Sequence, residues 1–175
     1  IRRQRQMCIR DRIHPCSLDL MSLRVHPMVP EELQLARHGF KQEVMSPGYI
    51  YLHPDGNSVV FGDSPEATAA EIARFSQKDA DEFIKLMKLV YAFIDMALPQ
   101  MRADPAQFNF SAKVKSLGAL LKNLGLKDDI MSLMSSPAHT SIIERFEHHV
   151  TQSALCCLLG AAGSITSDGS GIYFA

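Results

Sequence analysis

Two short runs of β-forming residues stand near the middle of the chain, at Tyr49–Leu52 and Ser58–Phe61. The residues between them include the triplet Pro-Asp-Gly at 54–56. Proline presets φ for a turn and glycine takes the left-handed position, so this spacing predicts a β-hairpin. A third strand is predicted near residues 41–45.

After the hairpin, apolar residues recur every three or four positions, the spacing of helices that bury one face. Ser64 and Ser76 stand where N-caps are expected. Asp79 forms a box-like arrangement with Ser76, in which Asp replaces the usual Glu or Gln. Ser111 is the predicted cap of a third helix, which Gly125 ends. The stripes predicted to face the core are Phe83, Leu86, Met87, Val90, Phe93, Ile94 and Ala97 in the second helix and Val114, Leu117, Leu120, Leu121 and Leu124 in the third.

The remaining pattern is helical except near the end of the chain. A short helix is predicted over residues 30–39, and further helices over 127–135 and 150–161. A Gly/Ser-rich loop at 163–171 then leads into a predicted strand at 172–174. A small antiparallel or mixed sheet with a helical cap is an α+β fold.

Charge is distributed unevenly along the chain. The 175 residues carry 18 Lys and Arg against 19 Asp and Glu, a net charge of −1, and 46% of them are apolar. Residues 1–12 hold five arginines and one aspartate, so the remainder has 13 basic and 18 acidic residues and a net charge of −5. This balance excludes a strongly basic nucleic-acid binder and a disordered acidic chain.

Residues 1–12 show no helical or alternating apolar period. We interpret them as translated adapter DNA or a disordered tail and leave them out of the fold. The chain begins with Ile and stops in an apolar run, so we expect it to be a piece of a longer protein. Because it shows neither the apolar region of a signal peptide nor a run long enough to span a membrane, we expect a cytoplasmic protein.

The seven histidines lack the spacing of a metal-binding motif, and we assign no metal ligands. Glu144 and His148, four positions apart, would form a ligand pair on one helix face. The adjacent His148 and His149 are expected to point about 100° apart on a helix. An exposed helical pair explains these residues more simply than a metal site does.

Neither cysteines nor glycines form a complete catalytic motif. Cys156 and Cys157 stand side by side in an apolar helix, which favours two small buried side chains over a redox dithiol. The Gly-x-Gly at 169–171 is followed by Phe174 where the dinucleotide fingerprint needs a third small residue. We therefore assign no catalytic residue.

Four segments nevertheless resemble a known family in their order and spacing. They are Glu-Leu-Gln-Leu-Ala-Arg-His-Gly-Phe at 32–40, Tyr-Ile-Tyr-Leu-His-Pro-Asp-Gly at 49–56, the helix start Ile-Ala-Arg-Phe-Ser-Gln-Lys-Asp-Ala at 72–80, and the tail at 146–173. Together they are similar to the middle and later parts of phytoene-desaturase-like FAD-dependent oxidoreductases, of the flavin amine-oxidase and carotenoid-desaturase superfamily. The resemblance runs from Met28 to the end of the chain.

The resemblance implies that residues 13–175 are part of the substrate or cap domain of a two-domain flavoprotein. The FAD-binding Rossmann domain, with its GxGxxG motif, has no counterpart in this sequence. Such enzymes remove hydride from an apolar or amine-bearing substrate and pass the electrons to FAD. We expect the fragment alone to bind no FAD and to be inactive.

The resemblance also implies two sets of site residues. Gly169, Gly171 and Tyr173 match the Gly-rich loop and strand that approach the flavin, and we expect them to bind the cofactor. A substrate wall is expected from the aromatic side chains of the hairpin, which are Tyr49, Tyr51 and Phe61. The implied partner is a small apolar substrate, without nucleic acid or a transmembrane segment, and peripheral association with a membrane stays open.

Two other functions fit the residues. One is a stand-alone helical protein-interaction module without catalytic activity, whose Met- and Phe-rich face would form the partner groove. The other is a small metal-dependent hydrolase that uses Glu144, His148 and His149. The first would need no upstream nucleotide-binding domain, and the second would need stoichiometric metal.

Overall fold

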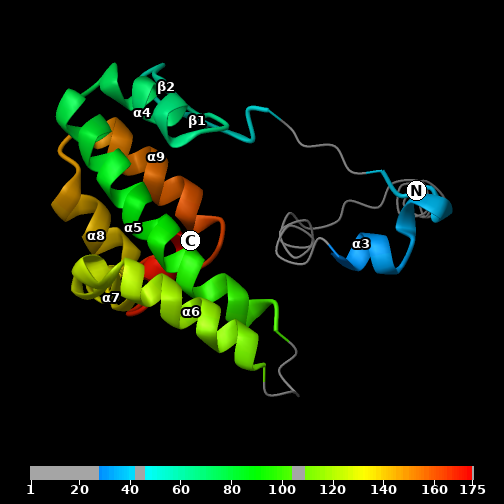
Figure 1. Cartoon of the computed structure of the whole chain (residues 1–175). Helices are drawn as coiled ribbons and strands as arrows, with labels where there is room; N and C mark the ends of the chain where they lie inside the picture. The colour runs from blue at the N-terminus through cyan, green and yellow to red at the C-terminus, as the bar shows by residue number, and fades with distance from the viewer. Residues whose placement is uncertain (1–27, 42–45, 104–108, 175) are drawn as a thin grey trace. The chain divides into compact units, whose positions relative to one another are not determined.

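In a computed structural model, the described residues are 28–41, 46–103 and 109–174 (Figure 1). The chain divides into two compact units, Ile1–Gln42 and Glu43–Ala175, which we describe separately. The predicted tail at 1–12 and residues 42–45 of the predicted third strand lie outside the described residues.

In the first unit, the predicted helix over 30–39 is divided into two short pieces. α3 covers Met28–Glu32 and the 3-10 helix η1 covers Leu35–His38. Gln34 between them has a φ of 51°, and this left-handed conformation interrupts the helix. Gly39, with a φ of 81°, ends η1 at the predicted position.

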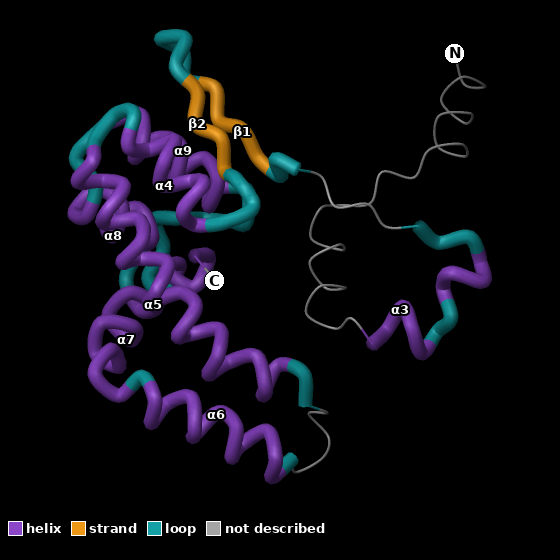
Figure 2. Tube along the Cα trace, turned by 45° about the horizontal axis from the view of Figure 1, so that its top comes forward, coloured by secondary structure: helices purple, strands orange, loops and turns teal. Residues whose placement is uncertain are grey.

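The second unit begins with the predicted hairpin. β1 (Tyr49–Leu52) pairs antiparallel with β2 (Ser58–Phe61), and Tyr49 stands opposite Phe61. Gly56 takes a φ of 90° in the turn, as the Pro-Asp-Gly triplet predicts. Both strands pack against α9 and β2 also packs against α4, as the orange strands of Figure 2 show.

Helices form most of the rest of this unit. They are α4 (Pro65–Ala73), α5 (Gln77–Met101), α6 (Phe110–Lys122), η2 (Leu124–Leu126), α7 (Lys127–Ser135), α8 (Ala138–Arg145), α9 (His149–Gly160) and η3 (Ser170–Phe174). The Oγ of Ser64 accepts the N–H of Ala67, and that of Ser76 accepts the N–H of Asp79, both at 3.1 Å. Both predicted caps are thereby confirmed.

The cap of α6 is Asn109 and not Ser111. The Oδ1 of Asn109 accepts the N–H of Ala112 at 3.0 Å, and the hydroxyl of Ser111 donates to the same oxygen. An Asn two positions earlier is as good a cap as Ser, and it allows the helix to begin sooner. Gly125 lies inside η2, because α6 already ends at Lys122.

A single apolar core lies among the helices and the hairpin. In α5, Phe83, Leu86 and Val90 of the predicted stripe are buried, and the rest of that stripe is partly buried. The mostly helical unit with its two-stranded antiparallel sheet confirms the α+β fold. Among the described helices, none combines the length and apolar character needed to cross a bilayer.

Most of the predicted inward stripe of α6 faces solvent instead. Val114, Leu117 and Leu121 are between 50% and 63% exposed, whereas Leu120 is partly buried. The opposite side of α6 meets α5, where the hydroxyl of Ser116 donates to the carbonyl of Met96 at 2.8 Å. Small side chains on that side permit close helix packing, which leaves the apolar stripe without a partner in the described part of the chain.

The predicted strand at 172–174 is wrong, because η3 occupies these residues. Two backbone N–H groups at the start of this segment donate to the end of α7. Gly169 in the preceding loop donates to the carbonyl of Ser135 at 2.8 Å, and Gly171 in η3 donates to that of Ser136 at 3.0 Å. These bonds hold residues 169–171 against the end of α7. Neither strand of the described sheet lies beside them there, so they have no strand with which to pair.

Candidate functional site

The residues directly before α9 are held against the start of α5 by a buried carboxylate. Asp79, which is 0% exposed, accepts the backbone N–H of Glu147 at 2.8 Å and that of His148 at 3.0 Å. Both bonds satisfy N–H groups at a helix start that lack partners within the helix. The contact therefore fixes the position of His149, the first residue of α9.

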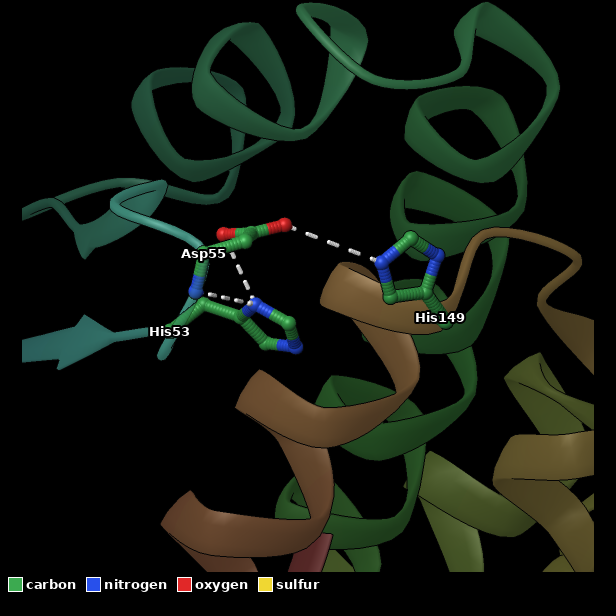
Figure 3. A group of neighbouring side chains, drawn as sticks. All are labelled: His53, Asp55 and His149. Carbon is green, nitrogen blue, oxygen red and sulfur yellow. Dashed lines mark hydrogen bonds and ion pairs between the residues drawn. The ribbon is translucent and has the colours of Figure 1, made fainter.

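His53, Asp55 and His149 form a cluster between the hairpin turn and α9 (Figure 3). Nδ1 of His53 lies 2.8 Å from Oδ1 of Asp55, and Nε2 of His149 lies 3.9 Å from Oδ2 of the same carboxylate. Each residue offers one possible metal-ligand atom, and the three atoms all lie within 4.8 Å of one another. Two imidazoles around a carboxylate can hold a proton or a divalent cation between them.

The turn keeps Asp55 ionised. Its Oδ1 accepts the backbone N–H of Asn57 at 2.9 Å. This bond, a second hydrogen bond with the side chain of Asn57, and a smaller effect of His53 together lower the pKa of Asp55 from 3.8 to about 2. The carboxylate is thus negative at neutral pH and available to a cation.

His148 does not take part in the cluster as a ligand. It is the N-cap of α9, and its Nδ1 accepts the N–H of Val150 at 3.3 Å. Because it precedes the helix, its ring stacks on that of His149 with centroids 4.6 Å apart, so the predicted 100° divergence is wrong. Within the described residues, Glu144 belongs to no group that could hold a metal ion.

The aromatic residues expected to form a substrate wall share one face of the hairpin. The rings of Tyr49 and Phe61 meet edge to face at 5.7 Å, and Tyr51 and Phe61 pack against the core. The hydroxyl of Tyr49 lies 3.3 Å from the Sγ of Cys157 in α9. This face is therefore turned toward the protein's own helix, and a substrate contact stays a prediction.

Of the residues expected to contact the flavin, Gly169 lies in the loop against α7, and Gly171 and Tyr173 lie in η3. Gly169 has a φ of 78°, and a Cβ on Gly171 would overlap the carbonyl oxygen of Leu133. The N–H groups of both glycines already donate to carbonyls of α7. These features give the glycines a packing role against α7, and contact with a flavin stays a prediction. Tyr173 in η3 is about one-third exposed.

The vicinal cysteines differ in exposure. Cys156 is partly buried and Cys157 is exposed. The prediction of two buried side chains is therefore wrong for Cys157 and met only in part by Cys156. Burial, together with the neighbouring Cys157, raises the pKa of Cys156. The hydrogen bond to Cys157 and partial burial raise the pKa of Tyr49. The raised pKa of Cys156 works against a thiolate at that position at neutral pH.

Sequence reasoning missed the cluster of His53, Asp55 and His149. His53 and Asp55 are two positions apart across a proline, a spacing that a tight turn can fold back on itself. That signal is local and visible in the sequence. The third member comes from the far end of the chain, and only the packing of β1 on α9 brings it there.

Comparisons with known proteins give a similarity to part of a mouse protein. Over 174 residues the chain is 26% identical to the mouse protein "Pyridine nucleotide-disulfide oxidoreductase domain-containing protein 2", which covers 87% of this chain. The chain spans about 30% of the length of that relative. No family model and no solved structure matches. The similarity supports a general relationship to oxidoreductases of the flavin type.

Proposed function

We propose that the chain is part of the substrate or cap domain of a FAD-dependent oxidoreductase. The observation that carries the proposal is the similarity over 87% of the chain to an oxidoreductase-domain protein. The four ordered segments that resemble phytoene-desaturase-like enzymes support the same class and a hydride-donating substrate that is apolar or bears an amine. FAD would be supplied by a part of the enzyme that this sequence does not contain.

The role of these residues in such an enzyme would be to shape and dry the substrate pocket. The hydride chemistry belongs to the flavin when it is bound. Since the N–H groups of Gly169 and Gly171 are already engaged by α7, we derive no step through the flavin at this loop. Tyr49, Tyr51 and Phe61 remain the proposed wall.

Sequencing the genomic reading frame upstream of Met28 tests the proposal. We expect a strand, a GxGxxG turn and a helix, with an acidic residue about 20 positions further on. The protein expressed from that longer frame should carry flavin absorbance after gel filtration, and the 175-residue chain should not. A stop codon followed by a methionine start just before Met28 would contradict the proposal.

One observation favours the alternative of a helical interaction module. Val114, Leu117 and Leu121 form an exposed apolar stripe on α6, at the spacing that a partner helix can cover. Hydrophobic-dye binding separates the two functions. If the stripe is covered by the rest of a larger enzyme, the longer protein binds far less dye than the 175-residue chain. Equal dye binding by both would favour the module.

A further inference from the structure

The strongest unassigned cluster in the described part of the chain is that of His53, Asp55 and His149. It joins two elements that are far apart in the sequence, the hairpin turn and the start of α9. The two imidazoles are 5.3 Å apart between ring centroids, and the carboxylate of Asp55 lies against both. The three side chains thus converge on one small volume (Figure 3).

We propose that His53, Asp55 and His149 bind one divalent transition-metal ion, with Zn²⁺ as the best match. Two imidazole nitrogens and one carboxylate oxygen are ligands that Zn²⁺ takes with three protein positions filled. Mg²⁺ and Ca²⁺ prefer oxygen ligands, so a site with two imidazole ligands is a poor match for either ion. A water molecule would complete the four-coordinate shell.

The distances suit an ion after small side-chain movements. Ligand atoms about 2.1 Å from a tetrahedral ion lie about 3.4 Å from one another. The 3.9 Å from His149 ends on Oδ2 of Asp55 and the 2.8 Å from His53 ends on Oδ1, so the carboxylate must turn to bring one oxygen to about 3.4 Å from both nitrogens. The side chain of His149 is 66% exposed and free of core packing, so it can move this far.

The surroundings of the cluster orient two of its ligands. The backbone N–H of Asn57 holds Oδ1 of Asp55, a contact of the kind that fixes a ligating carboxylate. Asp79 holds the backbone at His148, directly before His149. The Nδ1 of His53 lies 2.8 Å from Oδ1 of Asp55 and accepts the backbone N–H of that residue at 3.4 Å, a long bond that the ion would replace.

The bound ion would link the hairpin turn to α9 and stabilise the second unit. Because an ion that binds only the folded state adds stability by mass action, Zn²⁺ should raise the unfolding temperature in a concentration-dependent way. This inference does not depend on the proposed flavin chemistry. If the metal site were disproved, the proposed oxidoreductase function would be unaffected, and the reverse is also true.

Zn²⁺ titration of the full chain by calorimetry tests the site. His149→Gln and Asp55→Asn each remove one ligand at an exposed position, and His139→Gln is the matched control because His139 is exposed in α8 and outside the cluster. We expect one ion per wild-type chain, unchanged affinity in H139Q, and affinity at least tenfold weaker in H149Q and D55N. The cysteines are the same in all four proteins, so a difference assigns the ion to this cluster.

Two further readouts accompany the titration. Zn²⁺ should raise the unfolding temperature of wild type and H139Q but not of H149Q, and Mg²⁺ should raise none of them. The imidazole NMR signals of His53 and His149 should shift with Zn²⁺ while that of His139 stays. Absence of Zn²⁺ binding by the wild type, or equal affinity in wild type and either ligand variant, would overturn the proposal.

Discussion

The buried carboxylate of Asp79 accepts the backbone N–H of His148 at 3.0 Å and so fixes where α9 begins. The same carboxylate accepts the N–H of Glu147, while the backbone N–H of Asp79 is itself capped by Ser76. Only half of a capping box therefore forms at the start of α5. The side chain of Asp79 reaches another helix because the N–H of Ser76 already has the carbonyl of Ile72 as its acceptor.

Asp79→Ala should destabilise the fold by about 2 kcal/mol or more, because it leaves two N–H groups without an acceptor. Asp79→Asn should cost less, since one amide oxygen can still accept. Asp81→Ala is the matched control on the exposed side of the same helix, and its effect should stay within about 0.5 kcal/mol. Urea denaturation measures all three, and equal midpoints for D79A and D81A would contradict the role of Asp79.

The two faces of the central helices should respond differently to the same truncation. Leu86 in α5 is 0% exposed and Leu117 in α6 is 56% exposed. Leu86→Ala should lower the free energy of unfolding by about 2–5 kcal/mol, because it empties part of the core. Leu117→Ala should change it by less than about 0.5 kcal/mol. Thermal and urea unfolding test this, and a large loss in L117A would show that the α6 stripe is packed.

Local signals explain what could be predicted from the sequence. The hairpin, the caps at Ser64 and Ser76 and the bounds of α7 depend on residues within one or two turns of one another. Turn chemistry and capping act over that range, so neighbouring residues are enough to determine where these elements begin and end. The buried stripe of α5 is predictable for the same reason, since one broad apolar face dominates that helix.

Competing faces and distant contacts explain the rest. α6 has an apolar stripe and a small-residue side, and packing on α5 selects the small side through Ser116. Gly171 is fixed against Leu133 by a close approach that no spacing rule describes, which is why a strand was wrongly expected after it. His149 reaches Asp55 only through the docking of β1 on α9.

Acid should release the hairpin turn at an unusually low pH. The backbone N–H of Asn57 holds the pKa of Asp55 at about 2, below its ordinary 3.8. A carboxyl whose folded-state pKa is depressed stabilises the fold above its unfolded pKa, and that contribution is lost as the pH falls toward 2. A carboxyl-carbon NMR titration should show this midpoint for Asp55. A midpoint near 3.8 would mean that the turn does not hold the carboxylate.

Gly171→Ala separates packing from cofactor binding in the Gly-rich loop. A methyl group at this position would overlap the carbonyl oxygen of Leu133, so α7 and the loop must move apart at a cost of about 1–3 kcal/mol. Gly118→Ala is the matched control, because nothing lies within 4 Å of a Cβ at Gly118 in the exposed part of α6. Alanine there should add up to about 1 kcal/mol through its higher helix propensity. Urea unfolding of the two variants should therefore move in opposite directions. A G171A chain as stable as wild type would show that the glycine is not required for packing, and its predicted place beside the flavin would then become the better explanation.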